Sequence, residues 1–434
     1  MCDVLLIQPI HEKVDRKKTY PTGPPLGLGY MASVLVESGF DVKILDMNIH
    51  ASSSTEVQDI LKIKPSIIGV SVNTPSLPHT YTLLNELRGE GFGGEVVLGG
   101  PHLTSQPKSI IKLGCRYGFR GESDFDFERL CGLLIRKEGC EENIKNLFIK
   151  EGGCLKFNEN KTYSDLDSIP TPNRDMFEMG KYDFIQIVAS RGCPYKCIYC
   201  SMAGTKYRKR DSRLVVDEVI EVSRKYPNSM IGFSDDILTF NQGFVEDMCD
   251  ILIRRESKVK WSCTTRADLV NEKLIKKMRL AGCWHMSFGV ESGVEDIRYE
   301  IGKNIPNQTY KDVFNVCDNY GVITRAYIMF GHPNESLKEM VQTINFTKEL
   351  KPKECCFSLT SIYPGTGLAA WAIKNNIINE DVWEENMVKG LGAPVYLPEG
   401  VAFKDIEKIL LLAVKTLKPT PIGAVKEIIK RLIK

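Results

Sequence analysis

Over the first 120 residues, short apolar runs alternate with segments whose apolar residues have the spacing of a helix. This alternation restricts the possible folds of the chain more than any other feature of the sequence. The runs that predict strands are 4–7, 42–46, 66–72, 95–100 and, more weakly, 116–119. Residues 26–37 have the spacing of a helix that ends before Gly39. Strands that alternate with helices at this interval predict a parallel sheet with right-handed crossovers, which is a doubly wound α/β domain.

The residues that follow these strands are small, polar or glycine, as expected at a ligand site. Doubly wound sheets bind ligands beyond the carboxyl ends of their strands. The candidates there are Gln8, Ser71, Asn73, Thr74, Gly99, Gly100, His102, Gly121 and Glu122. Because glycine lets the backbone come close to a ligand, these turns favour a flat and bulky one.

A second informative feature is a group of three cysteines in a CxxxCxxC pattern, Cys193, Cys197 and Cys200. This spacing lets three thiolates converge on one iron–sulfur cluster, which prefers thiolate ligands. With three thiolates, one iron of a four-iron cluster stays open to bind a substrate. The alternatives are a structural zinc site or three unrelated thiols. Zinc commonly takes four ligands in CxxC pairs, and the sequence shows no second pair.

Composition limits the class of protein. A chain of 434 residues is longer than one ordinary domain and predicts two or three. Its net charge of +2 gives no basis for a nucleic-acid partner. No apolar run reaches the roughly eighteen residues of a membrane span, and the N-terminus lacks the pattern of a signal peptide. Fourteen cysteines then predict a cytoplasmic protein whose thiols stay reduced, in an anaerobic organism.

A proline-rich stretch divides the chain. Residues 168–174 cannot continue a helix or a central strand. We therefore expect a first domain over 1–165, a linker over 166–183, a second module over 184–366 and a mostly helical segment over 367–434. The last ten residues, 425–434, have the spacing of an amphipathic helix, which we expect to dock on the protein.

The residues around the cysteine triad resemble the radical S-adenosylmethionine (SAM) superfamily. In that family the open iron binds SAM, and the reduced cluster cleaves it to a 5′-deoxyadenosyl radical. The resemblance implies a partial (β/α)6 barrel over 184–366 with the three cysteines as cluster ligands. The residues that it implies for SAM are Tyr199 beside adenine, Ser234, Asp235 and Asp236 at the ammonium group, Arg266 at the carboxylate and Glu291 at the ribose.

Three residues in this module have an alternative structural interpretation. The alternative for Tyr199 is a packed tyrosine of the core, and the alternative for Arg266 is an ion pair at the surface. His332 stands where the family pattern has leucine, and we expect it to be a solvated histidine in a turn.

The first domain resembles the Rossmann-like cobalamin-binding domain that precedes many radical SAM modules. The matching segments are 25–32, 99–104 and 121–123. The resemblance adds Leu26 and Gly27 to the candidates at the strand ends as cobalamin-binding residues. The D-x-H-x-x-G motif, whose histidine binds cobalt from below, is absent from this sequence. The lower face of cobalt would then be bare, water-bound or capped by a loop residue. For His102 the alternative is a hydrogen-bonded histidine of the loop.

Together the two resemblances imply a cobalamin-dependent radical SAM C-methyltransferase. In that family SAM methylates cob(I)alamin, and a second SAM supplies the radical that abstracts hydrogen from an unactivated sp3 carbon. That carbon then takes the methyl group from methylcobalamin. The expected partners are an electron donor such as a ferredoxin or flavodoxin, and a substrate that is a small molecule or a residue in a protein or peptide.

The compact chain is compatible with a protein substrate such as glutamine, the residue modified by the family's methyl-coenzyme M reductase C-methyltransferase. The same cofactors also serve cyclases and rearrangement enzymes, which sequence does not separate from methyltransferases. A methylthiotransferase is a further alternative. It would need a second cluster and a small β domain at the end of the chain, and the spacing of the other cysteines does not fit this.

Overall fold

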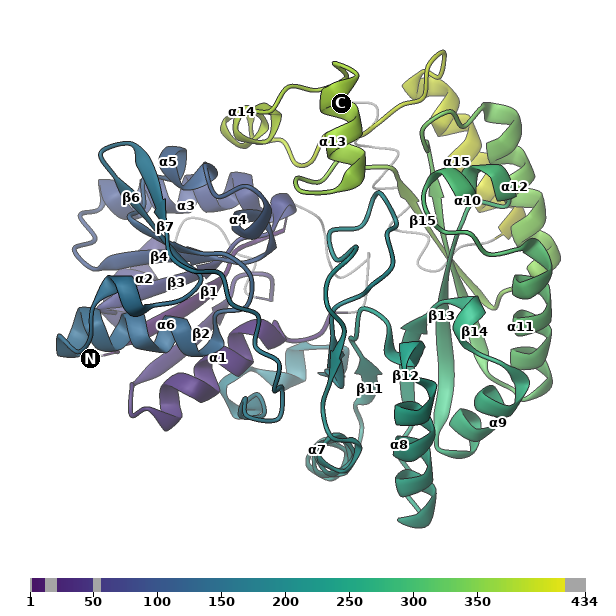
Figure 1. Cartoon of the computed structure of the whole chain (residues 1–434), viewed down its shortest axis with the longest axis horizontal. Coiled ribbons are helices and arrows are strands. Elements are labelled where there is room, and N and C mark those ends of the chain that lie inside the picture. The colour runs from purple at the N-terminus through teal and green to yellow at the C-terminus, as the bar shows by residue number, and fades with distance from the viewer. Residues whose placement is uncertain (1, 12–21, 50–55, 418–434) are drawn as a thin grey trace.

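The structure is a computed structural model that describes residues 2–11, 22–49 and 56–417 (Figure 1). The chain forms two α/β units in succession, each built around its own sheet, and a helical segment follows them. The amphipathic helix predicted over 425–434 lies outside the described residues.

The first sheet has the strand order β2-β1-β3-β4-β5-β6-β7. Its strands are β1 (Val4–Gln8), β2 (Val42–Asp46), β3 (Ile67–Ser71), β4 (Glu95–Gly99), β5 (Tyr117–Phe119), β6 (Leu147–Glu151) and β7 (Cys154–Phe157). The first five are parallel, and β6 and β7 add an antiparallel edge that the sequence did not predict. Gly152 and Gly153, both with positive φ, form the tight turn between these two strands.

Helices cover both faces of this sheet, as the doubly wound prediction requires. On one face, α1 (Leu26–Glu37) and α6 (Asp124–Cys131) pack against the strands. On the other, α2 (Glu56–Ile63), α3 (Leu77–Gly89) and α5 (Ser109–Leu113) do so. The short helix α4 (Pro101–Ser105) begins directly after the carboxyl end of β4. The parallel strands follow the flavodoxin-like order 2-1-3-4-5, which places a crevice where the order reverses.

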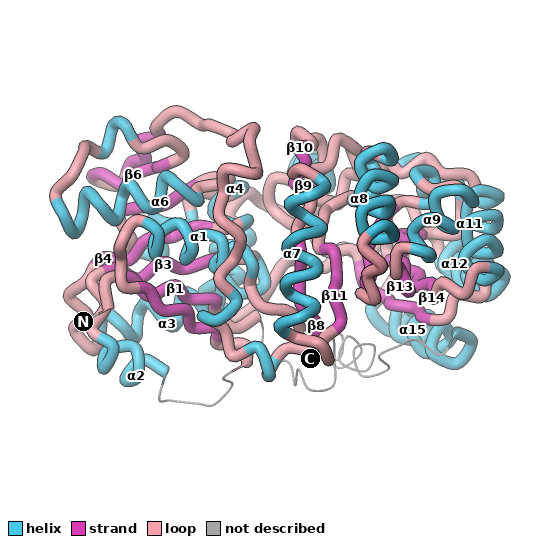
Figure 2. The backbone as a smooth tube through the Cα atoms, turned by 90° about the horizontal axis from the view of Figure 1, so that it is seen from below, coloured by secondary structure: helices cyan, strands magenta, loops and turns pink. Residues whose placement is uncertain are grey.

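The second sheet has six parallel strands in the order β15-β14-β13-β12-β11-β8. They are β8 (Phe184–Ile187), β11 (Met230–Phe233), β12 (Trp261–Thr265), β13 (Cys283–Glu291), β14 (Ile323–Phe330) and β15 (Glu354–Leu359). The helices on its outer face are α7 (Ser212–Lys225), α8 (Gln242–Arg254), α9 (Glu272–Leu280), α11 (Asn307–Asn319) and α12 (Leu337–Leu350) (Figure 2). This arrangement confirms the predicted partial (β/α)6 barrel.

The two faces of the second sheet differ in character. Residues that point toward the helices are buried and apolar, such as Cys263 on β12 and Ala326 on β14. Some of their neighbours on the inner face are polar and at least partly accessible. Thr264 is exposed in the middle of the central strand β12, and Tyr327 on β14 is half-buried. Because successive side chains of a strand alternate between faces, the barrel has an apolar outer layer and an inner face that carries accessible polar groups beside buried residues such as Ser287 and Met329.

The segment after the second sheet is helical, as predicted, and contacts both units. It contains α13 (Gly367–Lys374), α14 (Val382–Lys389) and α15 (Phe403–Leu417). Helix α15 packs on α12 outside the barrel, whereas α14 packs against α3 of the first unit. No helix in the described part of the chain is long and apolar enough to cross a membrane.

Candidate active site

The cysteine loop begins at a glycine that no other residue could replace. Residues Ser190–Arg191 (β9) pair with Arg208–Lys209 (β10), and the loop between them carries the triad. Gly192 has φ +90, and a Cβ atom there would overlap the carbonyl oxygen of Lys206. The loop therefore leaves β9 through a left-handed glycine directly before Cys193.

The three cysteines are free thiols in a well-ordered turn. Cys197 is buried, and Cys193 and Cys200 are partly exposed. The amide of Cys200 donates to the carbonyl of Cys197 at 3.1 Å, and the amide of Ile198 donates to that of Ile301 at 3.0 Å. Burial raises the pKa of the Cys193 and Cys200 thiols. The donor set is thus all sulfur, which fits an iron–sulfur cluster.

A zinc ion and a four-iron cluster differ in how closely they bring the cysteine sulfur atoms together. Within residues 2–11, 22–49 and 56–417, no three His, Cys, Asp or Glu side chains are arranged to hold a single metal ion. Zinc–sulfur bonds of about 2.3 Å would require the sulfur atoms to lie close around one centre. A four-iron cluster separates its thiolate ligands more widely.

Tyr199 and Glu291, both predicted at SAM, meet beside the triad. The Tyr199 hydroxyl donates to Glu291 Oε1 at 3.0 Å, and Lys303 Nζ lies 2.9 Å from the same oxygen. Glu291 ends β13 with φ +63, a rare conformation for a residue with a side chain. Lys303 is buried, yet the carboxylate of Glu291 holds the pKa of Lys303 above its usual value. Burial, followed by the charge of Glu291, raises the pKa of Tyr199.

Sequence reasoning missed Lys303. A lysine that follows a glycine in a loop has no local signal that separates it from a solvated one. The role of Lys303 is seen only in the structure, where this loop contacts the end of β13.

Arg266 is not a surface residue. Its Nε and Nη2 atoms donate to the two oxygens of Asp268 at 2.9 and 2.8 Å. The guanidinium also lies 3.8 Å from the centre of the Tyr195 ring, and Nη1 lies 4.0 Å from Cys197 Sγ. Arg266 thus places a positive charge beside the cysteine loop, and its contact with the SAM carboxylate stays a prediction.

The acidic pair after β11 supports the backbone of the cysteine loop. Asp235 is fully buried and accepts from the Ala189 amide at 3.1 Å and the Ser190 hydroxyl at 2.5 Å. Burial raises the pKa of Asp235 to about 7. Asp236 accepts from the Gly192 amide at 2.9 Å, and both Asp236 and Ser234 face a cavity. Binding of an ammonium group by these three residues stays a prediction.

The expectation for His332 was wrong. Its side chain is 1% exposed and lies 6.4 Å, centre to centre, from the Tyr199 ring. The imidazole faces the backbone of Glu291 and Met329. Neither ring nitrogen has a partner there at the distance and angle of a hydrogen bond. Burial lowers the pKa of His332 to about 4, so the ring is neutral at neutral pH. This turn lies in the interior, where the buried carboxylate of Glu335 accepts hydrogen bonds from the amides of Gly331 and His332.

A cavity of about 330 Å³ lies between the two α/β units. The first unit contributes the carboxyl ends of β3, β4 and β5 and the start of α1, and the second contributes the turn after β8 and the end of β11. The predicted cobalamin-binding residues that line it are Leu26, Gly27, Ser71, Gly99, Gly100, Gly121 and Glu122. At Gly100, with φ +96, a Cβ atom would lie 2.8 Å from the Val72 amide nitrogen. Gly100 is therefore required for packing against Val72, whereas a Cβ atom at Gly27 or Gly99 would meet nothing within 4 Å. The cavity lies where a doubly wound sheet binds its ligand.

The other four predicted cobalamin-binding residues do not line this cavity. Gln8 and Asn73 both contact the Nε2 atom of His11, at 3.0 and 3.1 Å. Thr74 and His102 belong to a buried hydrogen-bonded group, in which His102 Nδ1 lies 3.0 Å from the Thr74 hydroxyl. The arrangement is the alternative considered for His102, a hydrogen-bonded histidine of the loop.

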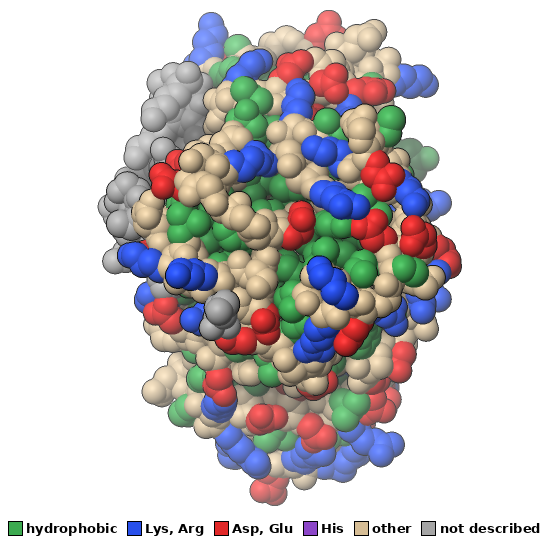
Figure 3. Space-filling model, turned by 90° about the vertical axis from the view of Figure 1, so that its left-hand side faces the viewer, with side chains coloured by type: hydrophobic (Ala, Val, Ile, Leu, Met, Phe, Trp, Pro, Cys, Tyr) green, Lys and Arg blue, Asp and Glu red, His purple; other side chains and the backbone are tan. Residues whose placement is uncertain are grey.

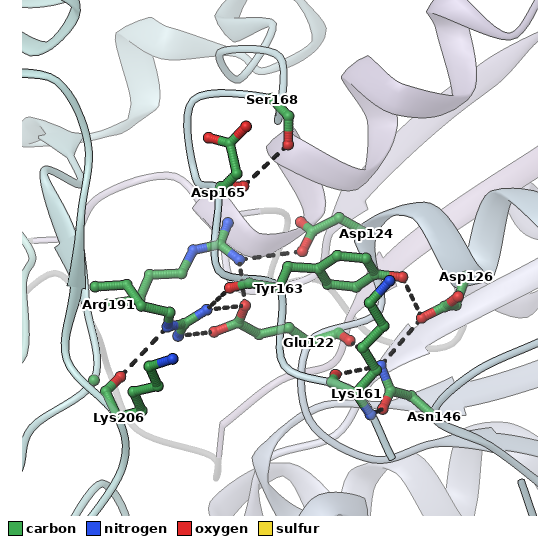
Figure 4. A network of polar contacts seen from close by, with 12 residues as sticks. Glu122, Asp124, Asp126, Asn146, Lys161, Tyr163, Asp165, Ser168, Arg191 and Lys206 are labelled. Atoms are coloured by element: carbon green, nitrogen blue, oxygen red, sulfur yellow. Dashed lines mark hydrogen bonds and ion pairs between the residues drawn. The ribbon is translucent and has the colours of Figure 1, made fainter. Parts of the chain in front are cut away.

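Charged residues from both units meet at the rim of the cavity (Figure 4). Arg191 Nη1 lies 3.1 Å from Asp124 Oδ2 and 3.3 Å from Glu122 Oε2. Arg208 makes a two-pronged contact with Glu122, at 2.8 and 2.5 Å. Asp124, Arg191 and Arg208 were not identified from the sequence, although Arg191 stands only two positions before Cys193.

Comparison with known proteins agrees with this geometry. The radical SAM superfamily matches residues 187–347, and the B12 binding domain matches residues 12–130. An uncharacterised methyltransferase of Pyrococcus horikoshii is 31% identical over 88% of this chain and 85% of its own length. The anaerobic magnesium-protoporphyrin IX monomethyl ester cyclase of Rubrivivax gelatinosus is 26% identical over 80% of this chain and 65% of its own.

A solved structure shows the same fold. The radical SAM methyltransferase TsrM from Kitasatospora setae, with cobalamin and a 4Fe–4S cluster bound, superposes with a TM-score of 0.78. The alignment covers 96% of this chain and 89% of TsrM at 17% identity.

The fold and the site define a radical SAM enzyme with a second cofactor-binding domain. The chain belongs to the cobalamin-dependent radical SAM methyltransferase family. The cofactors of this family are a 4Fe–4S cluster, SAM and cobalamin, which confirms the cofactors expected from the sequence.

Proposed function

We propose that this enzyme transfers a methyl group from SAM to an unactivated sp3 carbon of a polar substrate. The observation that carries the proposal is the cavity between the units. It joins the ligand edge of the B12-binding unit to Ser234, Asp236 and Arg191, which lie at or beside the cysteine loop. A corrin held there would lie next to the cluster. In this proposal SAM supplies both the methyl group and the radical, and cobalamin carries the methyl group.

The proposal assigns each part of the site a task. Cys193, Cys197 and Cys200 would hold the cluster. The Tyr199–Glu291–Lys303 group would bind the nucleoside half of SAM, because it offers a buried carboxylate whose hydroxyl and ammonium partners fix its position. Arg266 would hold the SAM carboxylate or balance the negative charge of the cluster.

The barrel interior supports a polar substrate. Its accessible positions carry hydroxyl, phenol and guanidinium groups from Thr264, Ser358, Tyr327 and Arg325. Arg325 is fixed by Glu354, whose Oε2 accepts from Arg325 Nε at 2.7 Å. Such a surface would pair with an amide or another hydrogen-bonding group, since unpaired buried polar groups are costly. A protein or peptide side chain such as glutamine satisfies this chemistry.

A second candidate is ring formation or rearrangement with the same cofactors. It is favoured by the relative from Rubrivivax gelatinosus, which is named as a cyclase that acts on a magnesium porphyrin ester. The polar inner face of this barrel supports methylation of a smaller polar group instead. Product mass separates the two reactions, because methylation adds one CH₂ unit and cyclisation does not.

The first experiment asks which molecule gains that unit. Proteins and metabolites from cells with and without the gene are compared by mass spectrometry, and a gain of one CH₂ at one residue or compound identifies the substrate. Purified enzyme, reconstituted without oxygen, is then assayed with and without cobalamin. Methylation that proceeds equally well without cobalamin would refute the proposal.

Substitution of serine for each triad cysteine tests the cluster. We expect each variant to lose both its iron and its SAM-cleavage activity. The control is Cys249→Ser, in the apolar core behind the barrel, and this variant should contain as much iron as the wild type. Loss of iron with retained methylation would contradict the assignment.

The same proposal includes an electron donor such as a ferredoxin or flavodoxin and a cytoplasmic location. It includes no nucleic-acid partner. On the face in Figure 3, basic and acidic side chains are interspersed.

A further inference from the structure

The cysteine loop is tied to the B12-binding unit through charged side chains. Arg191 belongs to β9, two residues before Cys193, and its guanidinium contacts Glu122 and Asp124 of the first unit. The Arg191 side chain is 19% exposed and also lies 5.1 Å from the centre of the Tyr30 ring on α1. The residue that leads into the cluster loop is therefore held from the opposite side of the cavity.

The strand that leaves the loop is held by the same carboxylate. Arg208 on β10 pairs with Arg191 in the two-stranded β9–β10 ladder. Its guanidinium is 7% exposed, makes the two-pronged contact with Glu122, and also donates to the Tyr163 carbonyl at 2.6 Å. Both ends of the loop thus converge on one side chain, Glu122.

Glu122 is itself fixed within the first unit. Its carbonyl oxygen accepts from Asn146 Nδ2 at 2.8 Å, and the same Nδ2 also donates to Asp126 at 3.1 Å. Asp126 in turn accepts from the Tyr163 hydroxyl at 2.6 Å. Figure 4 shows these side chains as one connected group between the two units. This group holds the main chain at Glu122, and the two arginines hold its carboxylate.

We propose that Glu122 is a positioning residue that sets the separation between the iron–sulfur cluster and cobalamin. The inference rests on the proposed function, since it assumes both cofactors. Its carboxylate lines the cofactor cavity and holds both arginines that flank the cluster loop. A charge-assisted two-pronged contact fixes distance and angle together, which a single neutral hydrogen bond does not.

The geometry matters because the reacting atoms come from two different units. A misplacement of about 1 Å in such an arrangement can lower a rate by about a hundredfold. Sequence signals do not reveal this contact, because Glu122 precedes Arg191 by 69 positions and belongs to another sheet. Glu122 would act on the reaction through Arg191 and Arg208.

The test uses full-length Glu122→Gln protein, reconstituted with cluster and cobalamin. Pulsed electron paramagnetic resonance measures the distance between the reduced cluster and cob(II)alamin from their magnetic interaction. We expect a single narrow distance in the wild type and a broader or longer one in the variant. Transfer of the SAM methyl group to cobalamin should fall at least about tenfold, while iron and cobalt contents stay unchanged.

Two further variants complete the design. Glu159→Gln removes an exposed carboxylate of the first unit, paired with Lys145 at 2.5 Å, and should match the wild type. Glu122→Asp retains the charge and should recover part of the narrow distance. If Glu122→Gln does not retain both cofactors, Arg208→Lys is measured instead, because lysine keeps the charge but cannot bind with two prongs.

The outcomes separate this inference from the proposed function. Wild-type protein that binds no cobalamin or no cluster would overturn the proposed function. Wild-type protein with both cofactors, combined with an unchanged distance distribution and unchanged methyl transfer in the Glu122→Gln or the substitute Arg208→Lys variant, would overturn the inference alone.

Discussion

Gly192 shows how a single residue controls the cluster loop. Its φ of +90 and its contact with the Lys206 carbonyl exclude any side chain. The chain must turn there to place Cys193, and the Asp236 carboxylate accepts the amide of that turn.

We therefore expect Gly192→Ala to distort the loop and lower the iron content of the reconstituted enzyme to less than about half, with a similar loss of SAM cleavage. Iron analysis and the visible absorption of the cluster measure this. Gly180→Ala is the matched control, since Gly180 has space for a methyl group and no positive φ. Full iron in Gly192→Ala would show that the loop tolerates the methyl group.

His102 makes stability depend on pH. Burial lowers its pKa from 6.5 to about 4, so the folded protein keeps it neutral while the unfolded chain takes up a proton below pH 6.5. The contribution of His102 to the free energy of unfolding is then largest above pH 6.5 and falls as the pH drops toward 4, by up to about 1.4 kcal/mol per pH unit.

The variant His102→Asn should show a shallower fall between pH 7 and pH 5, and chemical denaturation at each pH measures it. The free energy of unfolding of the variant should still fall in part with pH, because burial lowers the pKa of His332 in the same way. Parallel curves for the variant and the wild type would mean that His102 does not contribute.

At the scale of elements, helix α7 joins the linker to the barrel. Glu218 on α7 is buried and pairs with two arginines, Arg174 from the linker at 2.6 Å and Arg210 at 2.5 Å. The carboxylate thereby compensates two buried guanidinium groups. Removing it would take away the ion-pair partner that Arg174 has among the described residues and would leave Arg210 only the more distant Asp167, at 3.9 Å.

We expect Glu218→Gln to lower the free energy of unfolding by about 3 kcal/mol, measured by denaturant titration. The control is its neighbour, Asp217→Asn, which breaks an exposed pair with Arg255 and should cost less than about 1 kcal/mol. Equal effects of the two substitutions would contradict this account.

At the scale of the whole molecule, the C-terminal segment holds the two units together. Helix α13 follows Thr366 and packs on the cysteine loop, where the Leu368 amide donates to the Ile198 carbonyl at 2.7 Å. Helix α14 reaches the first unit, where Glu384 accepts from the Ser109 hydroxyl at 2.7 Å. Met387 on the same helix is buried in the core of the first unit.

Met387→Ala should therefore loosen the docking of α14 on the first unit. We expect the free energy of local opening to fall by about 2 kcal/mol, seen as faster hydrogen exchange in 382–389 and 109–113. Val388→Ala is the control, since Val388 is 57% exposed on the same helix. Unchanged exchange in Met387→Ala would show that α14 docks without this contact.

Features that depend on short-range pattern could be predicted from the amino-acid sequence. The helix predicted over 26–37 and the strand predicted over 42–46 have those bounds in the structure. The cysteine triad spans eight residues, so its spacing predicted the cluster, and the residues around it carried the resemblance to the radical SAM module. Periodicity and spacing predict such features well because residues that are close in the sequence share one backbone conformation. The β6–β7 edge had no such signal, since its strands are short and one is largely exposed.

Contacts between residues that are distant in the sequence became known from the folded chain alone. Folding buried His332, which its turn sequence had placed in solvent, and it brought Lys303 to Glu291. It also drew Gln8 and His102 into hydrogen bonds away from the cavity and set Glu122 against the arginines of the cluster loop. These contacts join residues from separate elements, so they follow from how the sheets and helices pack together. No local pattern encodes that packing, because the same short sequence can be buried or exposed according to what the rest of the chain places beside it.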